Sequence, residues 1–150
     1  MPSQPYRLAA PPEAVDDDPP LTAVMTRRIV AIVPDAELAV ALRLMAARRV
    51  RQLPVLDGTR CLGVVLETDV ARLLAARRPE PGVPAQRVGE LCRPVPALGP
   101  TARRSDAARR MHTEGTDVVL VTDGERLLGI LTATDLIRSL AADATRRGTR

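Results

Sequence analysis

The 150-residue sequence predicts an α/β (α+β) fold of two β-α-β-β-α repeats. These repeats are expected to pack with pseudo-twofold symmetry, with small sheets face to face and helices outside. The first observation is an internal repeat: a shift of 66 residues places residues 24–74 on residues 90–140 without a gap, with 17 of 51 pairs identical. The second is that apolar runs of strand and helix periodicity alternate within each copy. Because a unit of about 50 residues buries too little surface to be stable alone, the copies should share a core and form a cleft between them.

Composition divides the chain into five parts. Residues 1–20 form a proline- and aspartate-rich tail that has little to bury and is expected to be disordered. Repeat one spans 21–76 and repeat two spans 88–141, and a linker at 77–87 with three prolines and a glycine separates them. Residues 142–150 are polar and arginine-rich, which predicts a frayed C-terminal end.

The first half of repeat one predicts a strand followed by a helix. A β-branched run at 29–33 favours a short strand. Pro34-Asp35 then predicts a helix start with Asp35 as the N-cap. Apolar residues follow at spacings of four and three, which places them on one face of that helix. These residues are Leu38, Leu42 and Met45.

The second half of repeat one predicts a β-hairpin and another helix. Two apolar runs at 53–56 and 62–66 flank the turn dipeptide Asp57-Gly58. Thr68-Asp69 then opens the second helix. Repeat two reproduces this order, with strands at 95–98, 118–121 and 127–131 and helices from Thr101 to Glu114 and from Asp135.

The charge and aromatic content do not favour nucleic acid as a partner. The formal net charge is +4, and all 22 basic residues are arginines scattered from Arg7 to Arg150. Such scattering is typical of a solvated surface rather than of a basic patch. Tyr6 is the single aromatic residue of the sequence, so a base-stacking platform for single strands is missing.

Residues suited to catalysis or metal binding are isolated in the sequence. His112 is the single histidine, and Cys61 and Cys92 occupy non-equivalent repeat positions without a CxxC or Cys/His cluster. Cys61 aligns with Leu127, which predicts a buried apolar role. The sequence therefore predicts no disulfide, no metal site, no cofactor and no enzymatic activity.

The sequence also lacks the pattern of a membrane or secreted protein. It has no run of 18 apolar residues, and residues 1–20 carry six prolines and the run Asp16-Asp17-Asp18 instead of a basic and then apolar leader. We therefore expect a soluble, cytoplasmic protein with no membrane contact.

Ordered motifs in both repeats resemble the cystathionine β-synthase (CBS) domain. They are Leu-Pro-Val-Leu-Asp-Gly at 53–58, Gly-Val-Val at 63–65 before Thr-Asp at 68–69, and Gly-Ile-Leu-Thr-Ala-Thr-Asp at 129–135. The resemblance covers about residues 22–141. It implies a CBS pair, or Bateman module, which is a regulatory unit that binds adenosine-containing ligands such as AMP, ADP, ATP or S-adenosylmethionine between its repeats. It also implies a homodimer and an unidentified regulated partner protein.

The start of the last helix in each repeat suits a nucleotide. A carboxylate there can accept hydrogen bonds from ribose hydroxyls, while a nearby hydroxyl and the helix N–H groups can meet a phosphate. Repeat two supplies this set as Thr132, Thr134 and Asp135. Repeat one supplies Thr68 and Asp69 but has a leucine in place of the first hydroxyl.

The resemblance also implies a basic residue that faces phosphate just before the second strand. Arg51 occupies that position in repeat one, whereas repeat two has Asp117. The sequence thus predicts two unequal clefts, of which the one at Asp135 is better suited to ribose. Two alternatives stay open: the threonine and aspartate pairs serve only to cap their helices, or the chain is a structural dimerisation module with vestigial clefts.

Overall fold

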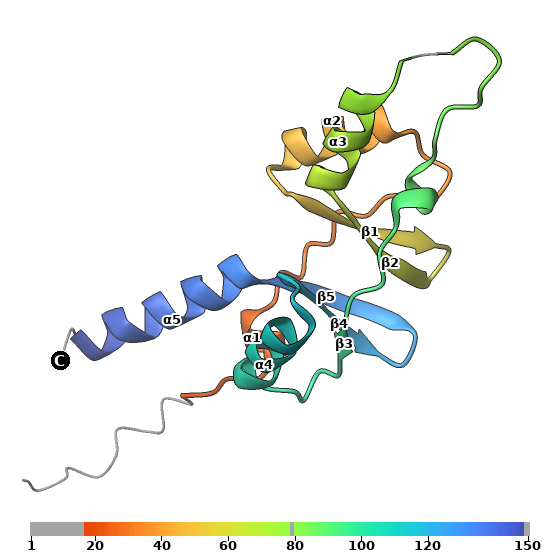
Figure 1. Cartoon of the computed structure of the whole chain (residues 1–150). Coiled ribbons are helices and arrows are strands. Elements are labelled where there is room, and N and C mark those ends of the chain that lie inside the picture. The colour runs from red at the N-terminus through yellow and green to blue at the C-terminus, as the bar shows by residue number, and fades with distance from the viewer. Residues whose placement is uncertain (1–16, 79, 149–150) are drawn as a thin grey trace, which may run out of the picture.

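The computed structural model describes residues 17–78 and 80–148, and over these ranges the chain forms two α/β units (Figure 1). Repeat one pairs β1 (Gln52–Asp57) with β2 (Arg60–Leu66) as an antiparallel hairpin. Repeat two pairs β4 (Val118–Asp123) with β5 (Arg126–Thr132) in the same way. The predicted fold class is confirmed. Most of the predicted N-terminal tail lies outside the described residues.

The outermost strand of each sheet is shorter than predicted. In repeat two, β3 (Ala97–Leu98) pairs parallel to β4 and gives the order β3-β4-β5. In repeat one, the predicted strand at 29–33 is wrong and reduces to a single parallel bridge between Ile32 and Val55. Both segments lie at a sheet edge next to prolines, Pro34 and Pro96, which have no N–H to donate to a ladder.

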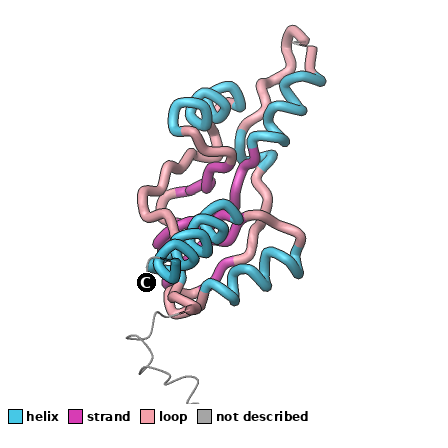
Figure 2. Tube along the Cα trace, turned by 90° about the vertical axis from the view of Figure 1, so that its left-hand side faces the viewer, coloured by secondary structure: helices cyan, strands magenta, loops and turns pink. Residues whose placement is uncertain are grey.

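Helices cover the outer face of each sheet, and the two inner faces meet. In Figure 2 the strands lie between the helices. Apolar side chains alternate along β2, where Val65 joins the helix-covered core of repeat one and Val64 joins a third cluster, with Leu120 and Ile130, between the sheets. The covering helices are α2 (Leu38–Arg48), α3 (Glu67–Ala76), α4 (Arg104–Glu114) and α5 (Ala133–Gly148).

The opening segment of each repeat packs on the other repeat. The short helix α1 (Leu21–Val24) lies in the core of repeat two, and the 3-10 turn η1 (Val88–Leu91) lies in the core of repeat one. Leu21 and Val88 are fully buried there. Their N–H groups donate to the carbonyls of Ala102 and Ala36, respectively, both at 2.9 Å. Each repeat therefore completes the core of the other.

Two helices begin later in the chain than the sequence predicted. The predicted N-cap at Asp35 is wrong, because the Ala36 carbonyl accepts from the opening segment and α2 begins at Leu38. The predicted start at Thr101 is wrong for the same reason, since α4 begins at Arg104. Each of these carbonyls bonds to the opening segment of the other repeat, and the helix begins two residues later.

A one-residue offset separates the repeats at this crossing. Thr26 pairs antiparallel with Ile130, and Arg93 pairs antiparallel with Val64. Ile130 lies 66 residues after Val64, whereas Arg93 lies 67 residues after Thr26. The gap-free alignment is thus wrong in its first residues. In space Arg93 takes the place of Thr26, although the sequence repeat aligns it with Arg27.

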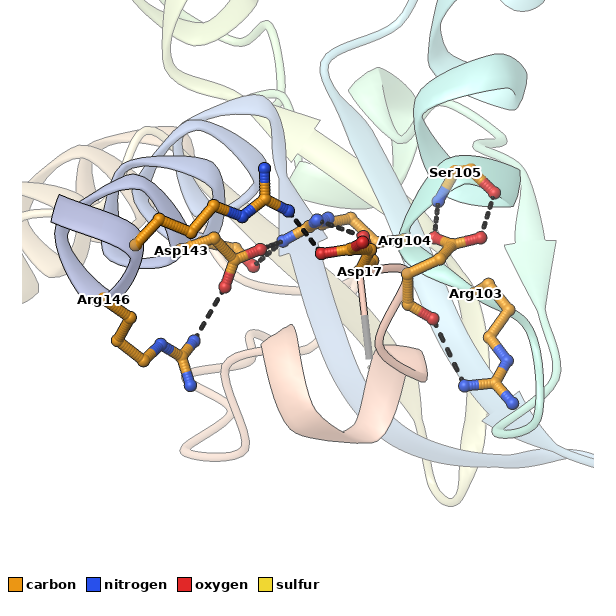
Figure 3. A network of polar contacts seen from close by, with 9 residues as sticks. Asp17, Arg103, Arg104, Ser105, Asp143 and Arg146 are labelled. Carbon is orange, nitrogen blue, oxygen red and sulfur yellow. Dashed lines mark hydrogen bonds and ion pairs between the residues drawn. The ribbon is translucent and has the colours of Figure 1, made fainter. Parts of the chain in front are cut away.

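The C-terminal half of α5 is fixed by a buried ion pair (Figure 3). Asp143 is 6% exposed and accepts a hydrogen bond from Arg104 Nη1 at 2.6 Å, and Arg104 is 7% exposed. Arg104 also donates to Ser139 Oγ at 2.7 Å and to the Asp17 carbonyl at 2.6 Å. The predicted fraying is therefore wrong as far as Gly148, where α5 ends.

A second carboxylate joins the same network from the N-terminal side. Asp18 accepts hydrogen bonds from the Ser105 N–H at 2.8 Å and from Ser105 Oγ at 2.6 Å. These bonds lower the pKa of Asp18, and hydrogen bonding to Arg104 lowers the pKa of Asp143. Residues 17–20 are thus part of the folded unit rather than of a disordered tail.

Asp143→Asn is expected to lower the Tm at pH 7 by roughly 5–10 °C, because an amide leaves the Arg104 charge buried without its counter-ion. Circular dichroism measures the transition. Because the Asp143 pKa lies below the ordinary 3.8, the carboxylate stabilises the fold above that pH and stops doing so as the pH falls through the folded-state pKa. The difference from wild type should therefore shrink below about pH 4.

The matched control for that variant is Arg110→Met, which removes an exposed ion pair with Glu114 and should move the Tm by less than about 2 °C. Equal shifts for the two variants at pH 7 would contradict a special role for the buried pair.

Candidate functional site

A cleft of about 610 Å³ lies between the two repeats, within the size range of small-molecule sites. One side comes from repeat one, from the segment after α1 and from the turn between α2 and β1. The other side comes from repeat two, at the junction of β5 and α5. The lining residues are Thr26, Arg28, Val30, Arg49, Val50, Arg51, Gln52, Pro54, Asp117, Ile130, Thr132, Ala133, Thr134, Asp135 and Arg138.

This cleft brings together residues that the sequence placed in different repeats. Arg51 comes from repeat one, and Thr132, Thr134 and Asp135 come from repeat two, yet all four line the same space. Thr68 and Asp69 are not among its lining residues. The cationic residue and the hydroxyls that seemed to belong to two incomplete sites therefore belong to one.

The junction of β5 and α5 holds Asp135 in a fixed position. Its Oδ2 accepts hydrogen bonds from the Thr132 N–H at 2.9 Å and from Thr132 Oγ1 at 3.0 Å. In return, the Asp135 N–H donates to Thr132 Oγ1 at 3.3 Å. This reciprocal pattern is a capping box, so the pair does cap its helix. The same bonds aim the buried carboxylate at the border of the cleft.

Three arginines of the cleft were not predicted from the sequence. Arg138 lies one turn after Asp135 and donates to its Oδ1 at 3.2 Å. Arg49 ends α2 in the left-handed conformation, with φ of 54°. Its repeat counterpart Gly115 also has a positive φ, 62°. The glycine in repeat two could therefore have indicated a left-handed backbone at Arg49. Arg28 gave no comparable signal.

The charges in the cleft favour an anion. Four arginine side chains line it, against the carboxylates of Asp117 and Asp135. Arg138 already pairs with Asp135, which leaves an excess of guanidinium groups. Guanidinium groups bind phosphate through paired N–H donors. The arrangement can therefore hold a polar group at the helix start and a phosphate at the arginines.

The CBS domain family matches residues 21–76 and again residues 88–142. The chain belongs to the CBS domain family. Its two CBS domains form a CBS pair, a type of regulatory module that is generally non-catalytic.

A curated relative of this CBS pair is a longer protein. The chain is 27% identical over 125 residues to MJ1225, an uncharacterized protein of Methanocaldococcus jannaschii. The match covers 83% of this chain and 44% of that protein, so the chain spans less than half the length of its relative.

Solved structures share the fold of this CBS pair. A putative acetoin utilization protein, AcuB of Vibrio cholerae, matches with a TM-score of 0.75 and 20% identity over 88% of this chain and 97% of its own. The CBS pair of MJ0100, solved with 5′-methylthioadenosine and S-adenosyl-L-methionine, matches at 0.74 and 17% over 84% and 98%. The ATP-bound CBS domain of a bacterial CNNM/CorC Mg²⁺ transporter matches at 0.70 and 20% over 81% and 87%.

The described part of the CBS pair, residues 17–78 and 80–148, contains neither a metal-ligand cluster nor a membrane-spanning helix. In this part of the chain no three His, Cys, Asp or Glu side chains gather where they could hold a metal ion. None of the helices there combines the length and apolarity needed to cross a membrane.

Thr132→Val is expected to reduce the free energy of unfolding by about 1 kcal/mol, because the capping hydroxyl of α5 is lost. Urea denaturation followed by circular dichroism, without ligand, measures this loss. Thr134→Val is the matched control, since Thr134 is exposed on the first turn and should change stability by less than about 0.5 kcal/mol. Equal effects of the two variants would argue against the capping role.

Proposed function

We propose that this CBS pair is a non-catalytic sensor that binds an adenosine-containing ligand in the cleft at Asp135 and signals to a partner protein or through its own dimer. The observation that carries the proposal is the meeting of a carboxylate at a helix start in repeat two with three arginines of repeat one across one inter-repeat cleft. A ribose and its phosphates need such a pair of features at a short separation.

The cleft offers a separate surface for each part of a nucleotide. The Asp135 carboxylate and Thr132 lie where ribose hydroxyls can donate and accept hydrogen bonds. The phosphates then lie toward the arginines from repeat one. The apolar side chains of Val30, Val50 and Ile130 provide a surface for the flat adenine ring, in keeping with the mostly apolar lining of small-molecule sites.

The excess of arginines favours nucleotides over S-adenosylmethionine. S-Adenosylmethionine carries a sulfonium cation, which guanidinium groups repel, whereas AMP, ADP and ATP carry anionic phosphates that they attract. The solved relatives include one CBS pair with S-adenosyl-L-methionine and one with ATP. The charge of the present cleft supports the second kind of ligand.

Isothermal titration calorimetry with AMP, ADP, ATP and S-adenosylmethionine tests the ligand. We expect the nucleotides to bind at least tenfold more tightly than S-adenosylmethionine, and Arg51→Ala to weaken nucleotide binding about tenfold or more because it removes a charge-assisted hydrogen bond. Arg126→Ala, at the distant β4–β5 turn, is the matched control and should leave affinity unchanged. Folded protein that produces no heat with millimolar nucleotide would refute the ligand proposal.

Exposed apolar residues on the helices support a homodimer. Ile137 is 67% exposed and Leu140 is 55% exposed, and their spacing of three puts them on one face of α5. Leu74 of α3, the repeat counterpart of Leu140, is 39% exposed. Exposed apolar residues that share a helix face, as Ile137 and Leu140 do, are typical of an association surface.

Leu140→Glu is expected to shift the protein from dimer to monomer, because a charge would be buried in the interface. Sedimentation velocity ultracentrifugation measures the shift, and Leu62→Glu, on the β2 hairpin, is the matched control for an exposed leucine elsewhere. A wild-type monomer at 100 μM, roughly the upper range of a weak dimer, would contradict the dimer. A dimer that binds no nucleotide would favour the alternative function, a structural dimerisation module.

A further inference from the structure

We infer that the chain binds one nucleotide rather than two, because Arg93 pairs with the carboxylate of the second cleft that would otherwise meet a ribose. The inference rests on the proposed function, since it concerns which of the two pseudo-equivalent sites accepts the ligand. It explains why the cleft at Asp135 gathers the binding groups of both repeats.

The ion pair between Arg93 and Asp69 uses both oxygens of the carboxylate. Arg93 Nε donates to Asp69 Oδ2 at 2.6 Å, and Arg93 Nη2 donates to Oδ1 at 2.7 Å. The Asp69 side chain is only 12% exposed. A ribose hydroxyl at this site would have to replace two short, charge-assisted bonds. Asp135, the repeat counterpart of Asp69, is bonded instead by Thr132 and Arg138 of its own repeat, and none of the described residues of the facing segment pairs with it.

The backbone of Arg93 is fixed by a close crossing with β2. Its N–H donates to the Val64 carbonyl at 2.8 Å, and its carbonyl accepts from the Val64 N–H at 2.9 Å. Gly63 makes this crossing possible: its φ is 145°, and a Cβ there would lie 2.2 Å from the Arg93 carbonyl oxygen. At the other cleft Thr26 holds the equivalent place, and its uncharged side chain lines the open space.

The second cleft also lacks the cations of the first. Arg49 and Arg51 correspond to Gly115 and Asp117 in the repeat, so the turn between α4 and β4 offers no arginine to a phosphate there. Leu66 replaces the capping hydroxyl, and α3 has no side-chain cap bond at its start. The paired Asp69 carboxylate and the replacement of Arg49 and Arg51 by Gly115 and Asp117 are independent observations that both point to one occupied site.

Equilibrium dialysis against radiolabelled ATP measures the number of sites. We expect about one ATP per chain at saturation. Asp69→Asn should leave both this number and the Kd unchanged within about threefold, whereas Asp135→Asn should weaken binding at least tenfold. Two ATP per chain, or a loss of bound ATP in Asp69→Asn, would overturn the inference.

A ligand-free experiment tests the closing contact itself. In a double-mutant cycle, Asp69→Asn and Arg93→Gln should each lower the Tm by about 2–4 °C, and the double variant should lower it by no more than either alone. If the Tm changes of the two single variants add up in the double variant, the ion pair does not contribute to stability and the inference is overturned. If wild type binds no ATP but the cycle shows coupling, the proposed function fails while the pairing of Arg93 with Asp69 stands, so the two failures are distinguishable.

Discussion

The exchange of opening segments between the repeats is the constraint on which the rest of the structure depends. Leu21 is buried in the core of repeat two and Val88 in the core of repeat one, so neither core is complete without the other repeat. The exchanged segments cross the hairpins at Gly63 and Gly129, where a Cβ would lie within 3 Å of the crossing chain. Because the segment after α1 lines the cleft as it leaves its crossing, the contact that joins the cores also builds the site.

The same crossing makes the clefts unequal without altering the symmetry of the fold. An offset of one residue places Thr26 at one cleft and Arg93 at the other. The Arg93 side chain is 58% exposed, so its ion pair with Asp69 adds at most about 1 kcal/mol to stability. An effect of that size is small for the fold. It matters for binding because the counterparts of Arg49 and Arg51 at the second cleft are Gly115 and Asp117, which cannot attract a phosphate that would displace Arg93.

The sequence predicted those features that depend on near neighbours in the chain. Both hairpins follow from apolar runs around Asp57-Gly58 and Asp123-Gly124. The glycine of each turn has a positive φ, 62° at Gly58 and 60° at Gly124. The N-cap at Asp35 and the frayed C-terminus were wrong because bonds from distant segments decided them. Arg51 and Asp135 were predicted one repeat at a time, but nothing in local spacing shows that they share a cleft.

Helix α5 joins the cleft to the remaining polar network. Its first two turns carry Asp135 and Arg138 at the cleft, and eight residues after Asp135 the buried pair of Asp143 with Arg104 holds the helix to α4. At a rise of about 1.5 Å per residue, these points lie about 12 Å apart along one rigid element. Under the proposed function, a ligand that competes for Arg138 acts on one end of a helix whose other end is fixed. The exposed face formed by Ile137 and Leu140 lies between the two ends. Under the proposed function, this face is the part of α5 through which ligand binding in the cleft can affect a partner protein.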